Sequence, residues 1–128
     1  MSWYLTTNQI RRLQIEITNY CNAACPLCDR ENVGKEKLNN TVISFDKIKS
    51  VITNDDWSSL NQIHLCGNYD EPTIHPDCMD IVKWLIGNTS ANTEIRIASN
   101  GGTRDESFWK ELGELSDKHR VNHKDNER

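Results

Sequence analysis

The sequence lacks the features that mark several broad classes of protein. Its 128 residues contain no run of about 18 apolar residues, so no segment predicts a membrane-spanning helix. Residues 1–12 lack the apolar centre of a secretory signal, and we expect a cytoplasmic protein with no membrane partner. The 15 Lys and Arg against 19 Asp and Glu give a net charge of −4 with no basic stripe, which disfavours nucleic acid as an electrostatically held partner.

A complete disulfide framework is also lacking, because the five cysteines are an odd number. Three of them, Cys21, Cys25 and Cys28, lie within eight residues. A reducing cytosol leaves such residues as thiols, so the group predicts a metal or cofactor site. Cys66 and Cys78 are more typical of ordinary buried thiols.

Hydrophobic periodicity predicts alternating strands and helices. Apolar residues alternate with polar ones at 13–17, 63–65 and 95–97, and helical spacing is found at 45–52, 79–86 and 108–115. This order predicts an α/β protein of about three βα units, with parallel strands joined by right-handed crossovers. We expect one domain over residues 1–115 and a disordered polar tail over residues 116–128. Any open α/β sandwich fits the same pattern.

Local signals place the helix starts and one polar face of the sheet. Ser44 predicts an N-cap, and Thr103 with Glu106 predicts a capping box for the last helix. Polar side chains occupy the alternate strand positions, which indicates either the concave interior of a partial barrel or a solvated face. These side chains are Gln14, Glu16, His64 and Arg96.

The cysteine group directly follows the first predicted strand, at the end where α/β folds bind their ligands. Three thiolates on one loop can hold a soft metal centre such as an iron–sulfur cluster, and would leave one iron of a four-iron cluster open. A zinc site completed by His64 or His75 is an alternative, and inert buried thiols are a third.

The run IEITNYCNAACPLC at residues 15–28 closely resembles the cluster loop of the radical S-adenosylmethionine superfamily. The resemblance implies a [4Fe–4S] cluster held by Cys21, Cys25 and Cys28, with S-adenosylmethionine chelating the open iron. Reductive cleavage of that cofactor would yield a 5′-deoxyadenosyl radical that abstracts hydrogen from a substrate. Leu27 stands where the family often has an aromatic residue against the adenine.

Two further segments resemble motifs of the same family, each directly after a predicted strand. The run GNYDEP at residues 67–72, comprising Gly67, Asn68, Tyr69, Asp70, Glu71 and Pro72, is similar to the Gly-Gly-Glu-Pro motif that meets the amino group of the cofactor. Tyr69 and Asp70 replace its glycines, and Asp70 tolerates a positive φ less well than glycine does. Ser99 and Asn100 resemble a segment near the ribose and carboxylate, although Asn100-Gly101 alone predicts only a turn.

Together these motifs imply the first half of a radical S-adenosylmethionine core, a partial (β/α)6 barrel similar to a TIM barrel. An electron donor such as a flavodoxin or ferredoxin is implied, whereas the catalytic residues and the substrate are not. An open sheet edge at residues 95–97 favours self-association or a second chain. The alternatives are a non-enzymatic fragment that binds a cluster or zinc, and a small α/β interaction domain with incidental thiols.

Overall fold

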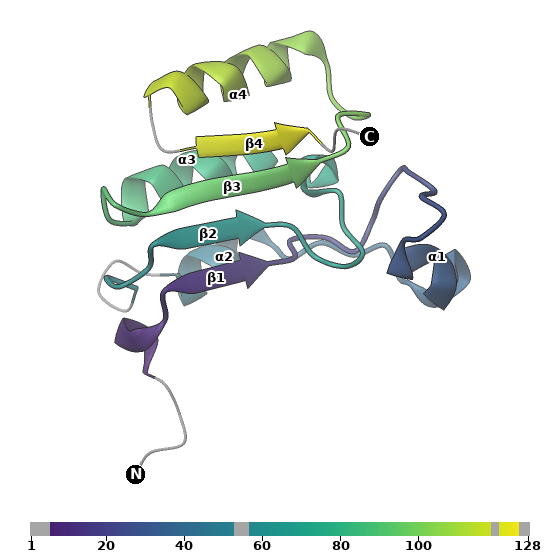
Figure 1. The fold of residues 1–128 in the computed structure, drawn as a ribbon, viewed down its shortest axis with the longest axis horizontal. Coiled ribbons are helices and arrows are strands. Elements are labelled where there is room, and N and C mark those ends of the chain that lie inside the picture. The colour runs from purple at the N-terminus through teal and green to yellow at the C-terminus, as the bar shows by residue number, and fades with distance from the viewer. Residues whose placement is uncertain (1–5, 53–56, 119–120, 126–128) are drawn as a thin grey trace.

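The computed structural model describes residues 6–52, 57–118 and 121–125 (Figure 1). Strands and helices alternate along it, and a short helix α1 follows the cysteines. The elements in chain order are β1 (Arg12–Ile15), α1 (Asp29–Val33), α2 (Phe45–Val51), β2 (Gln62–Leu65), α3 (Cys78–Asn88), β3 (Glu94–Ser99), α4 (Glu106–Lys118) and β4 (Val121–Asp125). Short 3-10 helices occupy Thr7–Gln9, Lys35–Lys37 and Pro72–Ile74. None of the described helices is long and apolar enough to cross a membrane.

The strands form one parallel sheet in the order β1-β2-β3-β4. Leu13 pairs with Ile63, Ile63 with Ile95, and Ile95 with Val121, so the apolar positions lie in register across the sheet. The predicted α/β class, the parallel pairing and the three predicted strands are confirmed, although β1 ends at Ile15 and not at residue 17.

The fourth strand corrects two predictions. Helix α4 continues to Lys118 and residues 121–125 pair with β3, so these parts of 116–128 are not a disordered tail. Residues 119–120 and 126–128 lie outside the described residues. The sheet edge predicted at residues 95–97 is covered, and β4 is the edge instead. An edge strand needs main-chain hydrogen bonds more than apolar side chains, so the polar composition of this segment concealed it.

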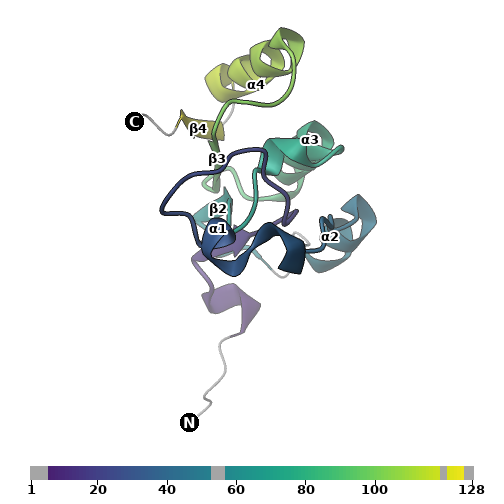
Figure 2. The same cartoon turned by 90° about the vertical axis from the view of Figure 1, so that its right-hand side faces the viewer.

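The core lies between the sheet and its covering helices. Helices α2 and α3 lie on the same side of the sheet (Figure 2). The strands contribute Ile63, Leu65, Ile95 and Ile97, and the helices contribute Ile48, Ile81, Val82, Leu85, Phe108 and Leu112, all at most 9% exposed. Each fully buried aliphatic side chain stabilises the fold by about 1.5–3 kcal/mol.

The opposite face of the sheet is polar, as the strand pattern predicts. His64 and Arg96 are half-buried at the same register on β2 and β3, and Gln14 pairs with this row from β1. Arg96 forms an ion pair with Glu94 at 3.0 Å. The sheet is open, so the barrel that the resemblance implies is not formed by these four strands.

The helix starts agree with the sequence in one case and differ in another. Ser44 caps α2, and its hydroxyl accepts a hydrogen bond from the Lys47 main-chain N–H at 3.2 Å. The capping box predicted at Thr103 is wrong, because the Asp105 carboxylate accepts from the Phe108 N–H at 3.0 Å instead. The Thr103 hydroxyl is engaged elsewhere, with the Thr73 hydroxyl.

Candidate functional site

The three clustered cysteines lie on an excursion of the chain that is closed at its base. After β1, Thr18 forms an antiparallel bridge with Val42. The Ile43 N–H donates to the Ile17 carbonyl at 2.9 Å, and the Thr18 hydroxyl donates to the Thr41 carbonyl at 2.8 Å. Residues 20–40 therefore leave and rejoin the fold at one point, at the carboxyl end of β1.

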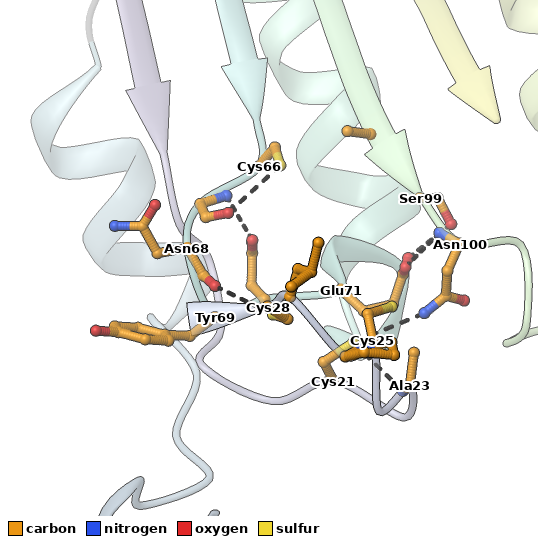
Figure 3. Close-up of a pocket in the computed structure, with 15 residues that line it drawn as sticks. Cys21, Ala23, Cys25, Cys28, Cys66, Asn68, Tyr69, Glu71, Ser99 and Asn100 are labelled. Carbon is orange, nitrogen blue, oxygen red and sulfur yellow. Dashed lines mark hydrogen bonds between the residues drawn. The ribbon is translucent and has the colours of Figure 1, made fainter. Parts of the chain in front are cut away.

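Cys21, Cys25 and Cys28 occupy one wall of a cleft of about 530 Å³ (Figure 3). All three are half-buried free thiols. The Cys28 N–H donates to the Cys25 carbonyl at 3.0 Å, which closes a tight turn between these two cysteines. Cys28 is also the N-cap of α1, so the turn leads directly into that helix. This places the cysteines at the carboxyl end of the sheet, as their position in the sequence predicts.

The loops after β2 and β3 form the rest of the cleft. Every residue that the three motifs nominated for the cofactor or the metal lines it, except Pro72. Pro72 is buried at the first position of a 3-10 helix directly behind Glu71. Three segments far apart in sequence therefore meet in one cavity, because the carboxyl ends of adjacent parallel strands share one edge.

Glu71 joins these loops through its carboxylate. The side chain is 2% exposed and accepts from the Ser99 hydroxyl at 2.7 Å, the Thr73 hydroxyl at 2.6 Å and the Asn100 N–H at 2.7 Å. The Glu71 N–H donates to the Tyr20 carbonyl at 2.9 Å, next to Cys21. The Glu71 carboxylate thus joins the loops after β2 and β3, and the Glu71 main-chain N–H joins them to the cysteine loop.

Two more carboxylates lie beside the loop after β2. Glu16 accepts from the Tyr69 N–H at 2.5 Å. A Cβ on Gly67 would collide with the Glu16 side chain, which would have to move away to accommodate it. Asp70 accepts from the Gly67 N–H at 2.5 Å through one oxygen, while its other oxygen is buried without a hydrogen-bond partner. Burial raises the pKa of Asp70 to about 7, with Glu16 and Glu71 adding to the rise. The φ of Asp70 is negative, so the strain expected at this position is absent.

Asn22 and Asn100 connect the cysteine loop to the loop after β3. The Asn100 amide donates to the Asn22 side-chain oxygen at 2.9 Å and approaches the Cys21 sulfur at 3.7 Å. The Asn22 amide donates to the Gly102 carbonyl at 3.0 Å. Gly101 adopts a φ of 71°, a left-handed conformation that glycine allows at low cost. Asn100-Gly101 therefore forms a turn, and Asn100 is also part of the cleft wall.

Sequence reasoning missed two further residues at the site. The Thr73 hydroxyl donates to the Glu71 carboxylate. The Arg104 guanidinium donates to the Thr73 carbonyl at 2.6 Å and to the His75 carbonyl at 2.5 Å. The main chain of Arg104 adopts a φ of 66°. The signal for Thr73 was its place directly after the Glu-Pro pair. Nothing in the sequence indicated Arg104, whose contacts depend on the approach of two distant loops.

Neither histidine proposed for the alternative zinc site is placed to bind a metal with the cysteines. His75 is buried, and its Nε2 lies 2.6 Å from the Ile43 carbonyl while its Nδ1 accepts from the Asp77 N–H at 3.0 Å. Both ring nitrogens are therefore engaged. His64 lies on the polar sheet face, where burial lowers its pKa, and does not line the cleft. Cys66, in contrast, does line the cleft, and burial raises its pKa to about 11.

The side chains that line the cleft are of the kind that bind an iron–sulfur cluster, but their sulfur atoms are not arranged around a common centre. Three thiols from one loop share a cavity wall, and thiolates are the ligands that such clusters take. Among the described residues, no three Cys, His, Asp or Glu side chains are gathered closely enough to hold a single metal ion. Burial raises the pKa of Cys21, with the charge on Arg30 among the effects that oppose the rise. A cluster would have to draw the sulfurs inward around itself.

Comparisons with known proteins give one informative similarity. No protein-family description and no solved structure matches the chain. The chain is 28% identical over 107 residues to a protein of Pyrococcus furiosus, named as a tungsten-containing aldehyde ferredoxin oxidoreductase cofactor-modifying protein. The match covers 83% of this chain and 28% of that protein, so this chain corresponds to less than a third of its relative's length.

Proposed function

We propose that this chain is the cluster-binding part of a radical S-adenosylmethionine enzyme, the first units of a partial (β/α)6 barrel. The observation that carries the proposal is the convergence of three motifs in one cleft. Each motif alone has a simpler interpretation, as a thiol loop, a bend or a turn. Their meeting at the carboxyl edge of a parallel sheet supports a single ligand-binding centre.

In this proposal Cys21, Cys25 and Cys28 hold a [4Fe–4S] cluster. When bound, the cluster and S-adenosylmethionine supply reductive cleavage to a 5′-deoxyadenosyl radical, with an electron from a flavodoxin or ferredoxin. The protein residues bind, orient and exclude water. Leu27 is 95% exposed at the mouth of the cleft, where it would cover an adenine ring without stacking on it.

The polar groups of the cleft suit a ligand that carries an ammonium group. The Glu71 carboxylate is taken up by protein donors, so Glu71 acts by positioning the main chain of its loop. Asp70 has an oxygen without a partner, and its carboxylate would accept from the cofactor's ammonium group after a small adjustment of the loop. Ser99 and Asn100 lie across the cleft, near the expected ribose and carboxylate.

The test is anaerobic reconstitution of the full chain with iron and sulfide. We expect about four irons per chain and an electron paramagnetic resonance signal, after dithionite reduction, that changes when S-adenosylmethionine is added. Cys25→Ala should lose the iron. Cys78→Ala is the matched control, because Cys78 is a buried thiol outside the cleft, and it should keep the iron.

Three results separate this proposal from the alternatives. Iron content no higher in the unaltered chain than in Cys25→Ala would overturn it. One zinc per chain in place of iron, with no response to S-adenosylmethionine, would favour the zinc-binding fragment. A cluster that does not respond to the cofactor would favour a non-enzymatic fragment that binds a cluster.

A further inference from the structure

Arg30 is a charged side chain buried inside the cysteine excursion, where no described residue forms an ion pair with it. It is 2% exposed, on the helix α1 that follows Cys28. One terminal nitrogen donates to the Asn40 side-chain oxygen at 3.3 Å, and the guanidinium lies 5.8 Å from the centre of the Tyr20 ring. Its Nε and other terminal nitrogen have no hydrogen-bond partner. The ion pairs of the described residues do not include Arg30.

Such an arrangement is unfavourable unless a negative charge compensates it. A guanidinium stays protonated in proteins, so Arg30 cannot escape the cost of burial by losing its charge. Burying an ion without a partner is unfavourable even after the surrounding protein relaxes. The two unpartnered nitrogens are shielded by the protein itself, so solvent does not contact them in this structure.

The position of Arg30 indicates where the compensating charge belongs. Tyr20, on which the guanidinium rests, directly precedes Cys21, and Asn40 directly precedes the stem that closes the excursion. Arg30 thus lies within the segment that carries all three cysteines.

We propose that Arg30 is the fixed positive charge that stabilises the anionic cluster held by Cys21, Cys25 and Cys28, and that it favours the reduced form. This inference rests on the proposed function. Three thiolates around an oxidised [4Fe–4S] core carry one net negative charge, and one electron from a reductant such as dithionite raises this to two. A nearby buried cation therefore stabilises the reduced site more than the oxidised site, because Coulomb energies scale with the product of charges.

The experiment is a redox titration of the reconstituted full chain, followed by electron paramagnetic resonance. Arg30→Gln should lower the midpoint potential by about 59 mV, which corresponds to an about tenfold loss in the reduction equilibrium of a one-electron couple. Arg30→Lys keeps the charge and should shift the potential much less. Lys37→Gln is the matched control, since it removes an exposed positive charge from the same excursion and should leave the potential unchanged.

Iron content is measured for every variant. If Arg30→Gln retains iron and its potential matches that of Lys37→Gln, the inference is overturned while the proposed function stands. If Arg30→Gln loses iron, the iron content of Arg30→Lys is compared. Iron retained by Arg30→Lys supports the role of the positive charge. Iron lost from Arg30→Lys overturns the inference and shows that the guanidinium has a structural role. An unaltered chain that binds no cluster overturns the proposed function and this inference together.

Discussion

Replacing Glu71 by glutamine should destabilise the chain by about 3 kcal/mol. The change keeps the size of the side chain but removes the charge that strengthens its hydrogen bonds to Ser99, Thr73 and Asn100. Charged hydrogen bonds contribute about 1.5–3 kcal/mol each and neutral ones about half as much. The glutamine NH2 group also replaces one of the two acceptor oxygens in a side chain that is 2% exposed. At the position that accepts from the Asn100 N–H it would leave that donor unsatisfied at a cost of about 1–3 kcal/mol, whereas at the other position the Ser99 and Thr73 hydroxyls can turn to accept from it.

Urea denaturation of the cluster-free chain, followed by tryptophan fluorescence, measures this loss. In thermal denaturation it corresponds to a Tm lower by about 10 °C for a chain of this size. Glu114→Gln makes the same chemical change at an exposed position of α4 and should alter stability by less than about 0.5 kcal/mol. Equal stability of the two variants would refute the argument that the Glu71 carboxylate holds the loops after β2 and β3 together.

Two further predictions concern the same fold. Burial raises the pKa of Asp70 to about 7 from its ordinary 3.8, so the folded chain binds this proton more tightly than the unfolded chain, and stability falls as pH rises between those values. Asp70→Asn should flatten this fall, measured by urea denaturation at about pH 5 and pH 8; an unchanged slope would contradict it. Ser44→Ala should cost about 1 kcal/mol, because the Lys47 N–H loses its cap. Unchanged stability in the same assay would show that water replaces the hydroxyl.

The sequence alone predicted the elements whose signals are local. Alternating apolar residues such as Ile95 and Ile97 identify strands because every second side chain faces the core. Ser44 identifies a helix start because its cap needs only the next turn of the chain. The parallel sheet followed from the helices between strands, and the shared edge then brought the three motifs together.

The errors arose where the signal was not local. The polar residues 121–125 form β4 because β3 offers them a main-chain edge, which no pattern in the segment itself reveals. The helix cap predicted at Thr103 was wrong because the Thr103 hydroxyl contacts the hydroxyl of Thr73, thirty residues earlier in the chain. The hydrogen bonds that the Glu71 carboxylate accepts from Ser99 and Asn100 could not be predicted for the same reason, since these residues reach it only in the folded chain.

By itself the sequence determined the α/β class, the parallel order of the first three strands, and the position of the three thiols at the end of β1. These properties depend on periodicity and spacing along the chain. Only the tertiary structure decided the fourth strand, the exclusion of His75 from the cleft, the clamp at Glu71 and the buried charge of Arg30. Burial and hydrogen-bond partners depend on which distant segments meet in space, and that information enters only when the chain has folded.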